Sequence, residues 1–257
     1  MSFTRYKVGQ IGPLDKKIKE IIFRSENSIV YMDEEDVIQW TAYSEELLAN
    51  FGDIQNNVSY WESICNRLFF KKNSYDYKTL LAEAYARMLD DKNIDLARNI
   101  IENTKERIEK HGKEVLKQSY ILSSITFTII IITVLILIVF NKHSLSEYIF
   151  YSESKFEIII TTLFGGIGAF VFTVLKLKTY TPEIILSKNV HILDGILRIF
   201  YGLISGLIII ICIKSNLLMG FVKDSEQSLY LYCFLGIIAG ASDLLIPNLI
   251  KQFENVS

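Results

Sequence analysis

The sequence predicts an all-α fold, a cytosolic helical bundle followed by four transmembrane helices. Residues 120–140 read YILSSITFTIIIITVLILIVF, with no charge, proline or glycine, and a helix of this length spans about 30 Å, the hydrocarbon thickness of a bilayer. Residues 1–118 contain 18 Lys/Arg and 20 Asp/Glu, whereas residues 119–257 contain nine of each. Before residue 119, no strand-like alternation persists for more than a few residues. We therefore expect a cytosolic helical domain at 1–118 and a membrane domain at 119–257.

The N-terminal part has apolar residues at helical spacing. Pro13 suits the first turn of a helix, where its missing N–H does no harm. The apolar positions that follow it are Leu14, Ile18, Ile21 and Ile22. Further apolar stripes run through 58–68 and 80–88, and a last long helix is expected from Ile94.

An acidic stretch lies in the first third of the chain. No Lys or Arg occurs between Glu26 and Glu62, although eight acids follow Tyr31. One interpretation is a solvated acidic helix start, where carboxylates complement the positive end of the helix. The other is a docking face for a basic partner. The candidate docking residues are Asp33, Glu34, Glu35, Asp36, Glu45 and Glu46.

Residues 94–140 contain no strong helix stop apart from Gly112, which follows His111. The last cytosolic helix is therefore expected to continue into the first membrane helix, with Gly112 as a candidate hinge. If so, movement of the soluble domain would reach the membrane through rigid backbone.

Four apolar segments are expected to span the membrane, at about 120–140, 156–175, 196–213 and 229–249. Ten Lys or Arg residues flank one set of segment ends and four flank the other. Because cytoplasmic loops carry the excess of positive residues, both termini are predicted to be cytoplasmic in a multi-pass arrangement.

Small residues recur at four-residue spacing in the last three segments. Such pairs let helix backbones approach closely in lipid, although chance placement of common glycines also produces them. The pairs are Gly165 and Ala169, Gly202 and Gly206, and Gly236 and Gly240. Packing within one chain and packing between chains both remain open.

Asp243 lies a few residues inside the predicted cytoplasmic end of the fourth segment. A bare carboxylate among lipid tails is costly, so it is expected to face protein, water or a cation. The candidate partners near the same boundary are Arg198, Lys176 and Lys178. The charge is interpreted either as a structural ion pair or interfacial residue, or as a pore-lining or gating carboxylate.

The sequence carries no pattern typical of an enzyme. We therefore expect the protein to have no enzymatic activity and to bind no cofactor and no metal ion. GGIG at 165–168 lies inside a membrane segment without a preceding strand or a phosphate-binding Lys-Ser/Thr. The three histidines fall in separate regions, and the three cysteines form no close-spaced pair. A net charge of −2 gives no electrostatic argument for nucleic acid.

The C-terminal segments resemble a class of bacterial proteins. The runs AGASDLLIPNLIKQFE, GGIGAFVFTVLK and ILRIFYGLISGLIIIICIK are similar in arrangement to multi-pass inner-membrane effectors of phage-defence systems. The resemblance covers roughly the last 100 residues and includes no catalytic motif. It implies a bacterial inner-membrane location and a role in antiviral defence.

Two functional hypotheses follow. In the first, the cytosolic domain senses an unknown ligand or protein partner and controls a homo-oligomeric bundle that permeabilises the membrane or conducts ions. In the second, the chain is a non-enzymatic anchor or adaptor that recruits a cytosolic partner through the acidic region at 31–62. Segment 120–140 lacks glycine and is apolar all round, so we expect it to face lipid at the periphery of the bundle.

Overall fold

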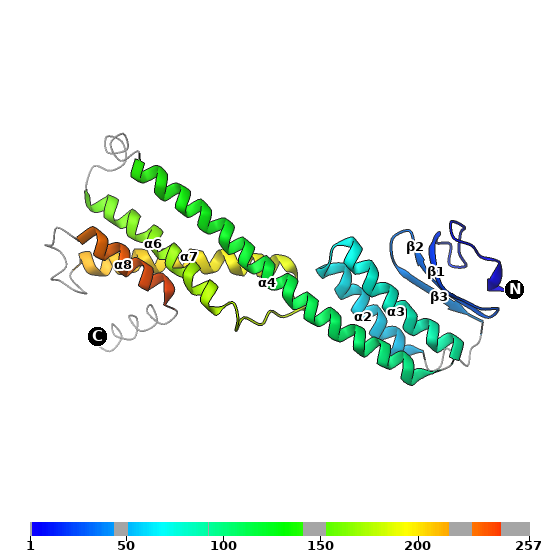
Figure 1. Ribbon diagram of the computed structural model, residues 1–257. Coiled ribbons are helices and arrows are strands. Elements are labelled where there is room, and N and C mark those ends of the chain that lie inside the picture. Colours follow the sequence, from blue (N-terminus) through cyan, green and yellow to red (C-terminus); the bar gives the residue numbers. More distant parts are fainter. Residues whose placement is uncertain (1, 44–50, 92, 141–152, 216–227, 243–257) are drawn as a thin grey trace. The chain divides into compact units, whose positions relative to one another are not determined.

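The computed structural model describes most of the chain. The described ranges are 2–43, 51–91, 93–140, 153–215 and 228–242. Within them the chain is mostly helical, with a small antiparallel sheet near the N-terminus (Figure 1).

The chain divides into two compact units. The first unit comprises Met1–Leu116 together with Glu183–Lys188, and the second comprises Lys117–Pro182 together with Asn189–Ser257. The segment Glu183–Lys188 therefore belongs to the first unit although the second unit flanks it in sequence.

The first unit begins with a 3-10 turn, η1 (Phe3–Arg5), and a three-stranded sheet. Its strands β1 (Ile18–Arg24), β2 (Ser28–Asp33) and β3 (Ile38–Ala42) are antiparallel in the order β1-β2-β3. The all-α prediction is therefore wrong in this region, as is the helix expected after Pro13, because Ile18, Ile21 and Ile22 lie in β1.

The burial of β2 explains why sequence periodicity missed the sheet. All six residues of this central strand are buried. Val30 and Met32 pack in the main core with the helices, while Ile29 and Tyr31 pack in a second cluster with Phe3 and Ile18. A strand buried on both faces reads as a continuous apolar run, SIVYM, without the polar alternation that marks a half-buried strand.

The acidic run that follows β2 is a tight turn and not a helix start. The N–H of Asp33 donates to the carbonyl of Val37, and Asp36 has φ of 60°, in the left-handed region. Asp33 accepts hydrogen bonds at Oδ1 from the backbone N–H groups of Glu35 and Val37, each at 2.9 Å. Asp favours such turns because its short side chain bonds to the backbone ahead of it. The helix-start interpretation is therefore wrong.

Helices α2 (Gly52–Leu68), α3 (Lys71–Asp91) and the first part of α4 (Ile94–Phe140) complete the first unit. Helix α3 contacts α2 and all three strands (Figure 1). The apolar stripe predicted at 58–68 forms the buried face of α2. Both tryptophans of the chain, Trp40 and Trp61, lie in this unit, so tryptophan emission reports on it alone.

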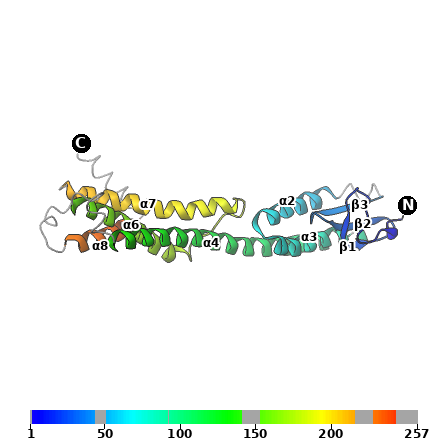
Figure 2. The same ribbon diagram turned by 90° about the horizontal axis from the view of Figure 1, so that it is seen from above.

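The second unit consists of the C-terminal part of α4 with α6 (Glu153–Lys176), α7 (Lys188–Lys214) and α8 (Ser228–Ala241). Figures 1 and 2 show α6, α7 and α8 side by side in both views. Among the described residues, three helices are long and apolar enough to cross a membrane, namely α4, α6 and α7. The described part of α8 is apolar but shorter, and the rest of the predicted segment 229–249 lies outside the described residues.

Helix α4 is a single helix of 47 residues. The prediction that the last helix of the soluble part continues into the first apolar segment is therefore confirmed. Its apolar window is also the least buried of the three, with 17% buried against 39% in α6 and 44% in α7. Leu122, Ile129 and Leu137 are all more than half exposed, as expected of a helix at the periphery of its unit.

Candidate functional site

The glycines of α6 and α7 meet directly within one chain. A Cβ placed on Gly165 would lie 2.9 Å from the Cα of Gly206 and would collide with the carbonyl oxygen of Gly202. A Cβ on Gly202 would in turn meet the side chain of Ala169. Both small-residue pairs therefore lie at one α6–α7 crossing, where backbone touches backbone.

Helix α8 contacts the same stretch of α6. A Cβ on Gly240 would lie 3.0 Å from the Cα of Gly165, and one on Gly236 would lie 2.6 Å from the carbonyl oxygen of Thr161. We call Gly165, Ala169, Gly202, Gly206, Gly236 and Gly240 the glycine seam. Gly165 is its centre, because it contacts both α7 and α8.

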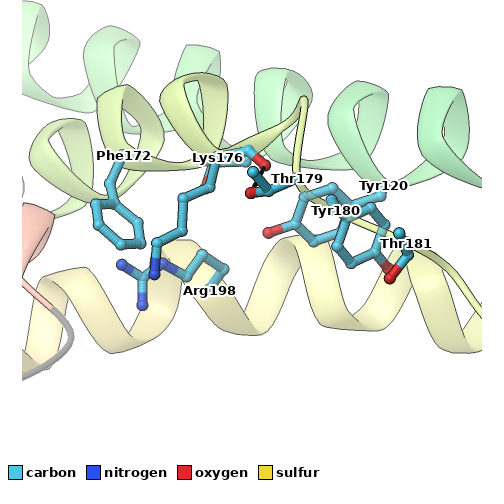
Figure 3. A pocket seen from close by; sticks show the side chains of 8 residues that line it. Tyr120, Phe172, Lys176, Thr179, Tyr180, Thr181 and Arg198 are labelled. Carbon is cyan, nitrogen blue, oxygen red and sulfur yellow. Dashed lines mark hydrogen bonds between the residues drawn. The ribbon is translucent and has the colours of Figure 1, made fainter.

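Two of the predicted boundary charges, Lys176 of α6 and Arg198 of α7, converge on one aromatic ring. The Nζ of Lys176 lies 4.2 Å from the centroid of the Phe172 ring, and the Cζ of Arg198 lies 4.4 Å from it. Figure 3 shows both side chains reaching toward this ring. Lys178 is exposed, and Asp243, their predicted partner, lies outside the described residues.

A pocket of about 400 Å³ opens beside these two cations. Two tyrosines form its other wall, since Tyr120 of α4 stacks on Tyr180 with ring centroids 4.4 Å apart (Figure 3). The Tyr180 hydroxyl is 2.9 Å from Nδ1 of the buried His191. The pocket was not predicted, because its tyrosines are far apart in sequence. The sequence feature that could have indicated this pocket is the clustering of Lys176, Tyr180 and Arg198 at one predicted membrane boundary.

An ion pair joins α6 and α7 elsewhere in the second unit. The Nζ of Lys214 in the last turn of α7 lies 2.5 Å from Oε2 of Glu157 near the start of α6, and both side chains are about one-fifth exposed. In the sequence, Lys214 is one of the four positive residues that flank the less basic set of segment ends. The pair ties the two helices at the ends away from Lys176 and Arg198.

The described acids of the candidate docking face already have partners. Glu34 pairs with Lys17 at 2.5 Å and Glu35 with Lys16 at 3.6 Å, all as exposed side chains on the turn and the segment facing it. Asp33 is buried in the turn. Glu45 and Glu46 lie outside the described residues. The docking role stays a prediction, with these local lysines as competitors for any basic partner.

Among the acids of this group that form ion pairs, Asp36 is the most buried, with 5% of its surface exposed. Its Oδ1 accepts a hydrogen bond from Lys19, and the Nζ of Lys71 lies 3.6 Å from its Oδ2. Burial raises the pKa of this carboxyl, but Lys19 and Lys71 together outweigh burial and hold the pKa below its ordinary value of 3.8. A carboxyl with a lowered folded pKa stabilises the protein above its unfolded pKa, and the contribution is lost as pH falls through the folded pKa.

We therefore expect Asp36→Asn to lower the free energy of unfolding of the first unit by about 1 kcal/mol near neutral pH. Asn tolerates the positive φ at this position, so the substitution removes charge without backbone strain. The difference from wild type should shrink as pH falls below 3.8. Urea unfolding of the full chain in detergent, followed by tryptophan emission, measures it. A difference that is constant with pH would contradict the assignment.

Gly112, the candidate hinge, lies inside the unbroken helix α4 and packs in the first unit. A Cβ there would lie 3.0 Å from Leu68 Cδ1 and 3.5 Å from Ile184 Cγ2, both at the ends of side chains. The segment Glu183–Lys188 thus joins the first unit partly through Ile184, beside Gly112. The hinge itself stays a prediction.

We expect Gly112→Ala to change the unfolding free energy by less than about 1 kcal/mol, because better helix propensity offsets the tight contact with Leu68. Gly112→Leu should cost roughly 1–3 kcal/mol through overpacking. Tryptophan-monitored urea unfolding compares the two. Equal stabilities of the alanine and leucine variants would show that this face of α4 is not packed.

The described residues contain no group of three or more His, Cys, Asp or Glu side chains that could hold a metal ion. Burial raises the pKa of Cys65 to about 12, so this thiol is a poor nucleophile. Cys212 and Cys233 are free thiols in the second unit.

Among the described residues, three candidate membrane-spanning helices are joined to a unit of sheet and helices. These features are those of a candidate membrane protein with a separate polar unit. No family model matches the chain, and no curated protein and no solved structure matches it either.

Proposed function

We propose that the chain is a bacterial inner-membrane effector in which the first unit senses a ligand or protein partner and controls the second. In this proposal the second unit, as a homo-oligomer, conducts ions or otherwise permeabilises the membrane. The observation that carries the proposal is that one helix, α4, belongs to both units. A helix transmits displacement along its axis because every turn is hydrogen-bonded to the next.

The structural elements of the first unit support a sensing role. It contains a sheet, three helices and its own apolar core, which is more structure than a membrane anchor needs. The chain segment Glu183–Lys188, between α6 and α7, also belongs to this unit. A change in the first unit therefore has two covalent routes into the second, through α4 and through this segment.

The surface of α4 supports oligomerisation as part of the proposal. The glycine seam joins α6, α7 and α8 within the chain, so the seam itself is occupied. The exposed apolar side chains of α4 remain for lipid or for α4 of another copy.

The proposal also includes a membrane topology. In this arrangement the fourth span includes α8, both termini are cytoplasmic, and the excess of Lys and Arg there sets the orientation. Antiviral defence is the setting that the C-terminal resemblance implies.

Membrane potential in bacterial cells tests the proposal. Overexpression of the full chain should depolarise the cells, read with a potential-sensitive dye, in proportion to the amount of chain in the membrane fraction. Asp243→Asn should change the depolarisation without changing that amount if the carboxylate gates conduction. An unchanged potential at high membrane levels of the chain would overturn the proposal and favour an anchor or adaptor.

A further inference from the structure

The ion pair between Glu157 and Lys214 involves all three helices that the glycine seam joins. The Nζ of Lys214 in α7 donates a hydrogen bond of 2.5 Å to Oε2 of Glu157 in α6. The same Nζ lies 5.6 Å from the centroid of the Tyr232 ring in α8, within the range of cation–π attraction. Tyr232 is only 2% exposed, so its ring belongs to the packed interior. A single ammonium group therefore interacts with α6, α7 and α8.

This ion pair lies in the part of the three helices that contains no glycine. Glycine is absent from 153–164 of α6, 207–214 of α7 and 228–235 of α8. The helices pack there through large side chains, such as Ile158 and Ile213. At the glycine seam, by contrast, backbone meets backbone. Two different contacts therefore join these helices, a close one at the seam and one made of side chains and a charge pair beyond it.

A charge pair differs from an apolar contact in how it separates. Both side chains of the pair are about one-fifth exposed. Apolar side chains of similar volume often stabilise such a contact as well as an ion pair does, so stability alone does not account for the charges. Glu157 lies near the start of α6, and Lys214 is the last residue of α7. Because water can hydrate each charge at a helix end once the pair breaks, the separated arrangement costs less than it would with apolar side chains.

Thr161 lies in the interior next to this pair and lacks a hydrogen bond. It follows Glu157 by about one helical turn on α6, and its side chain is fully buried. Its hydroxyl has no hydrogen-bond partner within the described part of the chain. The hydroxyls of Thr162 and Thr173 on the same helix each donate to the carbonyl four residues before them. Buried polar groups without a partner are rare, and water that reached Thr161 would supply one.

We propose that the Glu157–Lys214 pair is a latch. While it is intact, it holds the glycine-free ends of α6, α7 and α8 together. When it breaks, water enters between these ends as far as Thr161, and the glycine seam keeps the helices joined. The latch itself rests on the second unit alone. Its consequence rests on the proposed function, because separated helix ends ease the passage of ions and a broken latch therefore increases conduction.

Thiol labelling of Cys212, which is 7% exposed and lies two residues before Lys214, tests the latch. The full chain in detergent, with the other two cysteines replaced, is treated with a water-soluble maleimide under native conditions. We expect Glu157→Gln to raise the labelling rate about tenfold, because the ammonium of Lys214 loses its partner and the ends separate more often. The charge swap Glu157→Lys/Lys214→Glu should restore slow labelling. Lys155→Gln is the matched control, because it removes a charge from an exposed residue at the same end of α6.

A second thiol position distinguishes opening of the latch from unfolding. Ser124 in α4 is fully buried, and its hydroxyl donates to the carbonyl of Gly195 in α7. In a chain whose only thiol comes from Ser124→Cys, Glu157→Gln should leave the labelling rate unchanged. Equal labelling of Cys212 with and without Glu157→Gln would overturn the latch. Faster labelling at both positions would overturn it too, since it would show that the whole unit unfolds.

Membrane potential separates the latch from the proposed function. At equal amounts in the membrane fraction, Glu157→Gln should depolarise bacterial cells more than wild type does, and the charge swap should depolarise them as wild type does. Faster labelling of Cys212 without depolarisation by any of these chains would support the latch and overturn ion conduction. Faster labelling with equal depolarisation by wild type and Glu157→Gln would overturn the latch as a control of conduction.

Discussion

Gly165→Ala is expected to destabilise the second unit strongly, because Gly165 lies where α6 meets α7 backbone to backbone. The added methyl group would collide with backbone atoms of Gly202 and Gly206 in α7, and backbone cannot rotate away as a side chain can. Overpacking costs roughly 1–3 kcal/mol where neighbours adjust, and here the helices themselves must separate. Gly165→Leu should prevent stable packing altogether.

Gly166→Ala is the matched control, since it adds the same methyl group one residue further along the same helix. Its nearest neighbours, at 2.8 Å, are the terminal methyl groups of Ile131 and Leu203, which can change rotamer. Cys212 is buried in α7, so its thermal labelling by a thiol-reactive dye reports on the unit once Cys65 and Cys233 are replaced. Equal labelling temperatures in Gly165→Ala and Gly166→Ala would contradict the close packing at Gly165.

Lys78→Met should destabilise the first unit by about 3–5 kcal/mol, the usual effect of leaving one member of a buried ion pair alone. Lys78 is 2% exposed, and its ammonium donates to the carbonyl of Asp36 and lies 3.6 Å from Oε1 of Glu62. Glu62 is also nearly buried and accepts a hydrogen bond from the N–H of Ile38 at 3.0 Å. The pair therefore fixes β3 and the turn before it against α2 and α3.

The double variant Lys78→Met/Glu62→Gln should recover much of this loss, because Gln keeps the bond to Ile38 and leaves no buried charge. Burial raises the pKa of Glu62, so in Lys78→Met the penalty should grow as pH rises above 4.5, the ordinary pKa of this carboxyl, because the carboxyl is then forced to ionise. Arg98→Met, which breaks an exposed pair with Asp53, is the control and should cost less than about 1 kcal/mol. Tryptophan emission during urea unfolding measures all three. A loss as small in Lys78→Met as in Arg98→Met would contradict the buried pair.

The apolar helices could be predicted because their signal is local. Composition alone indicates α4, α6 and α7, and the spacing of small residues indicates which faces meet. Spacing could not reveal that Gly165 serves two neighbours at once, since this depends on how α7 and α8 are arranged around α6. The unbroken helix α4 was predictable from the absence of stop signals over 94–140.

The sheet could not be predicted by the same reasoning. Its central strand is buried on both faces, and a run such as SIVYM fits a buried helix as well as a buried strand. The turn residues Asp33 and Asp36 resemble a helix N-terminus, because acidic residues favour both settings. The ion pair between Lys78 and Glu62 could not be predicted from the sequence either, since it joins α3 to α2 across the core.

We propose that the first unit acts on the second through the continuous helix α4. Glu114 and Gln118 are exposed on α4 on either side of the division between the units. Replacing both with Gly should weaken the helix there by about 2 kcal/mol relative to replacing both with Ala, while removing the same side-chain groups.

Depolarisation of bacterial cells by these two variants, at matched amounts in the membrane fraction, is the most direct test. We expect the alanine pair to depolarise the cells as wild type does and the glycine pair to depolarise them much less. Equal depolarisation by the glycine and alanine pairs would contradict transmission through α4.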